Sequence, residues 1–172
     1  MTSGTLLLAL ALTAPQTPPA GSPIVASIRS GYELVKGHLL RAVEQLPEEH
    51  FTFKATPDVR SFGELFGHIA DANFGICGMA SGEKPTMRGI EKSKTTKAEL
   101  KDALAASFKF CDTAFDGMTE ARAAETVKFM LPGTHTRLGV LAFAAQHDWE
   151  HYGNLVTYMR LKGLVPPSSQ GR

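Results

Sequence analysis

The chain has 172 residues, of which 43% are hydrophobic and 20% are charged, and its formal net charge is +1. A chain of this length and composition can bury the core of one globular domain. Lys and Arg are scattered along the sequence, so the basic patch typical of a protein that binds nucleic acid or an anionic membrane is missing. The sequence has no apolar run long enough to span a bilayer. We therefore expect one globular domain, with no nucleic-acid partner and no membrane span.

The first 21 residues differ in composition from the rest of the chain. Leu6 to Leu12 is an unbroken apolar run with the minimum length for the core of an export signal, and it is far too short to cross a bilayer. No Lys or Arg precedes the run, and the residues after it make only a marginal cleavage site. We expect residues 1–21 to be an export signal to the periplasm or the cell exterior; a disordered leader on a cytoplasmic protein is the alternative. The bundle domain then covers residues 22–172.

From Ser22 onward the sequence is typical of a series of helices. Ser22-Pro23 is a common helix start, and capping boxes begin at Ser61 and Thr96, each with a Glu three residues later. No strand-like alternation of useful length is present. These signals predict an all-α chain and hence a bundle of four main helices. The helices are predicted between Ser22 and Pro47, from Phe62 to about Met79, between Thr96 and Gly117, and from Arg137 to Lys162.

The last predicted helix carries His147 and His151, with Asp148 and Glu150 between them. At about 100° per residue, two residues four positions apart lie one turn above each other on the same helix face. Both histidines share their face with apolar residues, so their imidazoles are predicted to point into the bundle. His68 is in register with apolar residues of the second helix, and it too is predicted to point inward.

Three inward imidazoles need partners, because burial removes water from the ring nitrogens and disfavours the charged form of histidine. One divalent ion would satisfy all three, and neutral imidazole is a preferred ligand of zinc and nickel. The HxxxH spacing alone is weak support: it occurs by chance on many helices and differs from the HExxH of zinc proteases. From the residues alone, a metal site and a structural histidine cluster both remain open.

Three stretches of the chain are similar to a known family: "TFKATPDVRSFGELFGHIADANF", "TRLGVLAFAAQHDWEHYGNLVTYMRLKG" and the tail "LVPPSS". They resemble the DinB-like (YfiT-like) family of metal-binding helical bundles, over nearly the whole range from Ser22 to Ser168. The resemblance implies a four-helix bundle with a long crossover connection. It also implies one divalent ion bound by a histidine of the second helix and two of the last helix, which match His68, His147 and His151.

Some members of this family transfer small thiols or carry out a thiol-dependent isomerisation. We expect a three-histidine metalloenzyme that acts on a small molecule by thiol S-transfer or metal-assisted hydrolysis, with zinc or nickel as the ion. Glu150 and Asp148 are candidate general bases, and for each the alternatives are to orient a histidine or to face solvent. A non-catalytic metal-binding module and a metal-free interaction bundle are the alternative functions.

The chain has two cysteines, Cys77 and Cys111, and no CxxC motif. Two cysteines so far apart in the sequence predict neither a disulfide framework nor a cysteine-based zinc site. We expect both to be buried thiols.

The last helix carries a second apolar stripe on the side away from the histidines. A helix of a bundle usually buries one stripe of ~100°, so the second stripe needs a cover. Either the first helix or a second copy of the chain could provide it, and we expect a symmetric homodimer. The stripe consists of Leu138, Leu141, Tyr152, Val156 and Met159.

Overall fold

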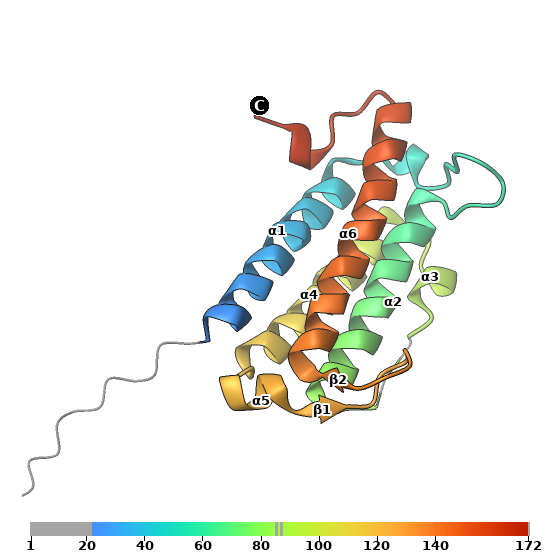
Figure 1. The fold of residues 1–172 in the computed structure, drawn as a ribbon. Coiled ribbons are helices and arrows are strands. Elements are labelled where there is room, and N and C mark those ends of the chain that lie inside the picture. Colours follow the sequence, from blue (N-terminus) through green and yellow to red (C-terminus); the bar gives the residue numbers. More distant parts are fainter. Residues whose placement is uncertain (1–21, 85, 87, 172) are drawn as a thin grey trace, which may run out of the picture.

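The computed structural model describes residues 22–84, 86 and 88–171, so the expected leader lies outside the described residues. Four long helices form a bundle in which α1 packs on α4 and α6, and α2 packs on the same two helices (Figure 1). α1 and α6 run in one direction and α2 and α4 in the other, so the connection from α2 to α4 returns along the bundle. The predicted all-α bundle with a long crossover is confirmed. The helices are α1 (Pro23–Gln45), α2 (Phe62–Ser81), α4 (Lys97–Asp116) and α6 (Arg137–Leu161).

Shorter elements join and flank these helices. β1 and β2 form a small antiparallel sheet that the sequence did not predict, and their connection carries Met130. Within the described residues, no helix combines the length and the hydropathy that crossing a membrane requires. The shorter elements are η1 (Glu48–His50), α3 (Ile90–Ser93), α5 (Glu120–Ala124), β1 (Thr126–Val127), β2 (His135–Thr136) and η2 (Pro167–Ser169).

The helix that carries His68 begins where its capping box predicts. The Glu64 amide donates to the Ser61 hydroxyl oxygen at 3.2 Å, and the Ser61 amide donates to the Glu64 carboxylate at 2.7 Å. At the other end, Gly82 adopts a left-handed conformation with φ 83°, which a glycine reaches without steric cost. α6 begins in a similar way, because the Gly139 amide donates to the Thr136 hydroxyl oxygen at 3.1 Å. These caps fix the register of the two helices that supply the histidines.

Cys77 and Cys111 form a disulfide, so the expectation of free thiols is wrong. Cys77 lies on α2 and Cys111 on α4, and the packing of these helices brings the two Cα atoms to 5.3 Å. Both side chains are fully buried. Because the bridge joins residues of different helices, spacing along the sequence could not reveal it. The disulfide ties α2, the helix of His68, to its neighbour α4.

The apolar stripe on the far side of α6 is covered within the chain. Tyr152 is 2% exposed, and its ring stacks on His38 of α1 with 5.0 Å between the ring centroids. Its hydroxyl oxygen accepts a hydrogen bond from the Ser168 amide at 2.9 Å, so the C-terminal tail closes over the same surface. Met159 is 1% exposed. α1 and the tail therefore provide the cover. This stripe gives no reason to expect a homodimer.

We predict that the disulfide contributes strongly to stability. A bridge between positions 34 residues apart lowers the entropy of the unfolded chain and stabilises the fold by roughly 3 to 4 kcal/mol in the chain-entropy account. The double substitution Cys77→Ala, Cys111→Ala should lower the free energy of unfolding by about this amount in urea denaturation. Two free thiols in wild-type protein unfolded without a reductant would contradict the prediction.

Candidate metal centre

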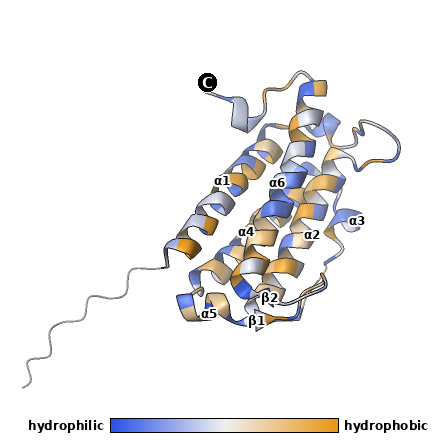
Figure 2. Cartoon of the chain, viewed as in Figure 1, coloured by the Kyte–Doolittle hydropathy of each residue, from blue (hydrophilic) through white to orange (hydrophobic). Residues whose placement is uncertain are grey.

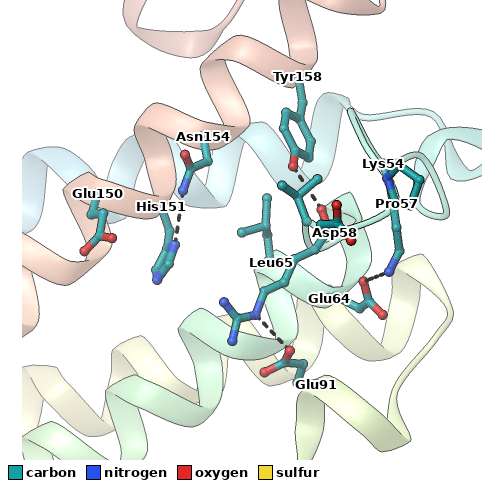
Figure 3. A pocket seen from close by; sticks show the side chains of 12 residues that line it. Lys54, Pro57, Asp58, Glu64, Leu65, Glu91, Glu150, His151, Asn154 and Tyr158 are labelled. Atoms are coloured by element: carbon teal, nitrogen blue, oxygen red, sulfur yellow. Dashed lines mark hydrogen bonds and ion pairs between the residues drawn. The ribbon is translucent and has the colours of Figure 1, made fainter.

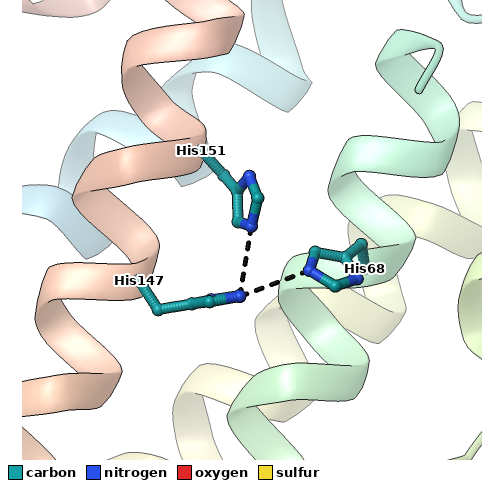
Figure 4. Close-up of side chains that lie close together, drawn as sticks. All are labelled: His68, His147 and His151. Carbon is teal, nitrogen blue, oxygen red and sulfur yellow. Dashed lines mark hydrogen bonds between the residues drawn. The ribbon is translucent and has the colours of Figure 1, made fainter. Parts of the chain in front are cut away.

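The three predicted histidines meet between α2 and α6 (Figure 4). The Nε2 atom of His147 lies 3.2 Å from Nε2 of His68 and 3.1 Å from Nε2 of His151. One ligand atom of each histidine lies within 4.8 Å of the others. The middle of α6, which carries two of the three, is coloured hydrophilic in Figure 2 although it packs on α2. The two helix faces predicted from the sequence thus form one cluster of ring nitrogens.

The surroundings of the cluster keep His147 and His151 neutral. Burial lowers the pKa of His147 to about 3, and repulsion from positive charge on His151, His68 and Arg60 adds to the shift. Burial also lowers the pKa of His151 to about 4, with the negative charge of Glu150 acting in the opposite direction. Both rings are therefore uncharged at neutral pH, and each has a lone pair free to bind an ion.

Glu91 orients the ring of His68. Its Oε2 atom lies 3.1 Å from Nδ1 of His68, and its Oε1 atom accepts a hydrogen bond from Nε of Arg60 at 2.8 Å. A carboxylate beside Nδ1 favours the tautomer in which that nitrogen carries the proton, which leaves the Nε2 lone pair facing the other histidines. This is the usual arrangement of a histidine that binds a metal.

Glu91 reaches His68 because α3 lies very close to α2. A Cβ atom on Gly67 would lie 2.6 Å from Cα of Glu91 and 2.9 Å from its nitrogen, so only glycine allows this approach. The buried Asp71 carboxylate accepts hydrogen bonds from the backbone amides of Arg88 at 2.9 Å and Glu91 at 3.0 Å. One glycine and one aspartate of α2 thereby place the carboxylate that orients His68.

The two acidic candidates differ in their surroundings. Glu150 is exposed and lines a cavity of about 600 Å³ together with His151, Asn154 and Arg60 (Figure 3). Asp148 is fully buried, and its carboxylate oxygens have no hydrogen-bond partner among the described residues. Burial raises the pKa of Asp148 well above its usual range, while its neighbour Asn73 opposes the shift. Glu150 can therefore reach a molecule in that cavity, whereas Asp148 lies inside the core and does not face solvent.

Asn154 lies one turn beyond His151, and its amide nitrogen is 3.4 Å from Nδ1 of that ring. When Nε2 of His151 binds an ion, Nδ1 carries the proton and needs an acceptor. A turn of the Asn154 amide by 180° brings its oxygen to Nδ1 without any other movement. With its amide turned, Asn154 would orient His151, whereas the carboxylate beside His68 is already in place.

The donor set and its spacing fit a divalent ion. Nitrogen ligands at 2.0 to 2.1 Å from one zinc ion in tetrahedral geometry lie about 3.3 Å from each other. The two measured separations between Nε2 atoms, 3.2 and 3.1 Å, are close to this value. Three neutral imidazoles suit zinc or nickel, whereas calcium and magnesium prefer oxygen ligands. His68, His147 and His151 could therefore hold one such ion.

Most of the sequence matches the model of a protein family. A sequence model of the DinB superfamily matches residues 32–155, which include all three histidines. The chain belongs to the DinB superfamily. No protein with a curated description matches the sequence.

Solved structures of DinB-like proteins and of an isomerase share the fold at low sequence identity. A DinB-like protein from Bacillus cereus ATCC 10987 aligns with a TM-score of 0.72 and 15% identity, covering 83% of this chain and 95% of that chain. A DinB-like protein from Bacillus subtilis aligns with a TM-score of 0.66 and 19% identity, covering 85% and 99%. A mycothiol-dependent maleylpyruvate isomerase aligns with a TM-score of 0.62 and 14% identity, covering 78% of this chain and 65% of that chain. At these identities the similarity shows the fold alone.

We predict that Gly67→Ala destabilises the fold by pushing α3, which carries Glu91, away from α2. The new methyl group would meet the backbone of Glu91, so α3 must move away, which should cost about 1 to 3 kcal/mol of unfolding free energy. Gly31→Ala on α1 is the matched control, since its Cβ meets no atom within 4 Å and alanine favours a helix by up to about 1 kcal/mol. Urea denaturation compares the two variants. Equal or greater stability of Gly67→Ala relative to wild type would show that α3 does not need the close approach.

Proposed function

We propose that this DinB-superfamily chain is a metalloenzyme in which His68, His147 and His151 hold one divalent ion, zinc or nickel, and that it acts on a small molecule. The convergence of the three Nε2 atoms carries this proposal, with separations of 3.1 and 3.2 Å about His147. Three protein ligands are typical of zinc sites that keep a position open for chemistry, whereas structural sites are closed by a fourth. The cavities that border the histidines support an open site.

A divalent ion at this centre would supply a Lewis acid that generates a nucleophile from water or from a thiol near neutral pH. The protein's own groups have separate tasks. Glu91 accepts a hydrogen bond from Nδ1–H of His68 and so keeps the Nε2 lone pair of that ring directed inward. In a hydrolytic reaction, Glu150 is the candidate for taking the proton of the attacking water. The guanidinium of Arg60, in the same cavity, is suited to an anionic group of the substrate.

Two reaction types fit this centre, thiol S-transfer and metal-assisted hydrolysis. The solved isomerase with the same fold is described as mycothiol-dependent, which supports the thiol reaction. The buried disulfide supports hydrolysis, because disulfides persist in oxidising compartments and small reduced thiols are reagents of the cytosol. Zinc-loaded protein incubated with a panel of thiols and electrophiles, and separately with esters and amides, distinguishes the two reactions. Turnover in neither panel would favour a non-catalytic metal-binding module.

The metal proposal is tested by the metal content of untagged protein. Wild type is expected to hold about one ion per chain, and the double variant His147→Ala, His151→Ala to hold almost none, because a single imidazole is a weak site. His135→Ala is the matched control, since the His135 ring contacts Phe129 and the Pro132 carbonyl oxygen, away from the cluster. Elemental analysis gives the occupancy, and circular dichroism verifies that the helices remain. Full occupancy in the double variant would refute the three-histidine site. A metal-free wild type would also refute the proposal and would leave the metal-free interaction bundle as the alternative.

We also propose that the chain works in an oxidising compartment, the periplasm or the cell exterior. The Cys77–Cys111 disulfide and the apolar run of residues 6–12 support this location. Protein isolated from its native host should then lack residues 6–12, occur outside the cytoplasm and contain no free thiol. Cytoplasmic protein with an intact Met1 and two free thiols would contradict the proposal.

A further inference from the structure

An apolar cavity of about 350 Å³ borders the histidine cluster on the side of His68 and His147. Its wall is apolar apart from these two imidazoles. It is built by one stripe of α2, by one residue of α6 a turn before His147, and by the connection between β1 and β2. The other lining residues are Ala72, Gly75, Ile76, Met79, Met130 and Phe143.

The cavity follows from the register of α2. Ala72 and Ile76 lie one and two turns beyond His68, so they continue the helix face that turns His68 inward. Phe143 stands at the same level on α6, with its ring centroid 6.5 Å from that of His147 and 5.1 Å from that of Phe129. The two helices therefore enclose a space that starts at the ring nitrogens and extends away along apolar side chains.

The mouth of this cavity is also apolar. Met130 lines it from the β1–β2 connection and is 60% exposed. Methionine is flexible and adapts its shape to an apolar ligand. An exposed Met130 thus offers surface that a molecule entering the cavity would bury.

The other side of the cluster has the opposite chemistry. The cavity of about 600 Å³ beside His151 is lined by Arg60, Glu91 and Glu150 among other polar groups. A molecule that contacts the centre therefore meets charged side chains on one side and apolar side chains on the other. Pockets of this kind use apolar walls for affinity and a few polar groups for orientation.

We propose that the substrate carries an apolar group, a phenyl ring or a short alkyl chain, which binds in the cavity of Ala72, Ile76, Met130 and Phe143 while its reacting polar group lies at the histidines. This inference rests on the proposed function, and it adds the substrate class. The apolar group binds because it leaves water for an apolar wall, and its length is limited by the cavity.

The first test uses metal-free protein, so that it does not depend on the ion. Protein with labelled methyl groups of isoleucine and methionine is titrated with ethylbenzene and followed by NMR. The signals of Ile76, Met79 and Met130 should shift, while those of Ile90 and Met159, which do not line the cavity, should stay in place. Absence of shifts at the three cavity residues would overturn the proposal.

Substitutions of lining residues test whether ethylbenzene binds in this cavity. Ala72→Leu fills the cavity and should weaken ethylbenzene binding at least fivefold, whereas Ala106→Leu, the same change on the exposed face of α4, should leave it unaltered. Met130→Lys is a second variant that should keep the fold, because this side chain is exposed; its charge at the mouth should also weaken binding. Equal binding by wild type, Ala72→Leu and Met130→Lys would place the ligand elsewhere and overturn the proposal.

The second test asks whether a ligand whose head group binds the ion also places its alkyl chain in the apolar cavity. Zinc-loaded protein is titrated by calorimetry with hydroxamates of increasing chain length, from acetohydroxamate to hexanohydroxamate, whose head group chelates divalent ions. Each buried methylene should tighten binding roughly fourfold in wild type, and this dependence should disappear in Ala72→Leu while acetohydroxamate binding is retained. If zinc binds but affinity is independent of chain length, the substrate proposal is wrong. If zinc does not bind at all, the proposed function fails, and the ethylbenzene titration alone decides whether the apolar cavity takes a ligand.

Discussion

The packing of α2 on α6 brings three imidazoles into one small space, with the Nε2 atoms of two pairs 3.1 and 3.2 Å apart. Buried polar groups at such distances are unfavourable unless each finds a partner, and burial disfavours positive charge on His147 and His151. The surroundings accordingly lower the pKa of His147 to about 3 and of His151 to about 4. A divalent ion would accept the lone pairs of all three rings together, and Glu91 holds the ring of His68 in an orientation that suits this role.

Residues of α2 position the group that orients His68. Gly67 allows α3 to lie against this helix, Asp71 holds the backbone of α3, and Glu91 then reaches His68. One turn beyond His68, α2 lines the apolar cavity. Further along α2, the Cys77–Cys111 disulfide ties this helix to α4. Glu91, the apolar cavity and the disulfide all depend on α2, while α6 supplies the other two histidines; nearly all residues of α2 are buried because it packs on α3, α4 and α6.

The sequence predicted the elements that depend on local signals, and it failed where distant segments meet. Capping boxes at Ser61 and Thr96 and helical register located the long helices and the inward faces of the three histidines. Glu91 was missed because it lies on α3, a helix of only 4 residues in the connection between α2 and α4, and no periodicity relates it to His68. The pairing of Cys77 with Cys111 and the cover that α1 gives to Tyr152 depend on which helices are neighbours, which single-helix patterns do not contain. Asp148 stands beside a histidine in the sequence yet turns into the core, since adjacent residues of a helix face different ways.

We propose that imidazole nitrogens of His68, His147 and His151 hold one ion in a site that remains open. X-ray absorption spectroscopy of zinc-loaded protein tests it most directly, because it reports the type, number and distance of the ligands around the ion. We expect a shell of nitrogen ligands at about 2.0 to 2.1 Å with the multiple-scattering signature of three imidazoles, together with at least one further light atom from solvent. An ion surrounded only by oxygen ligands, or a protein that retains no zinc after dialysis, would contradict it.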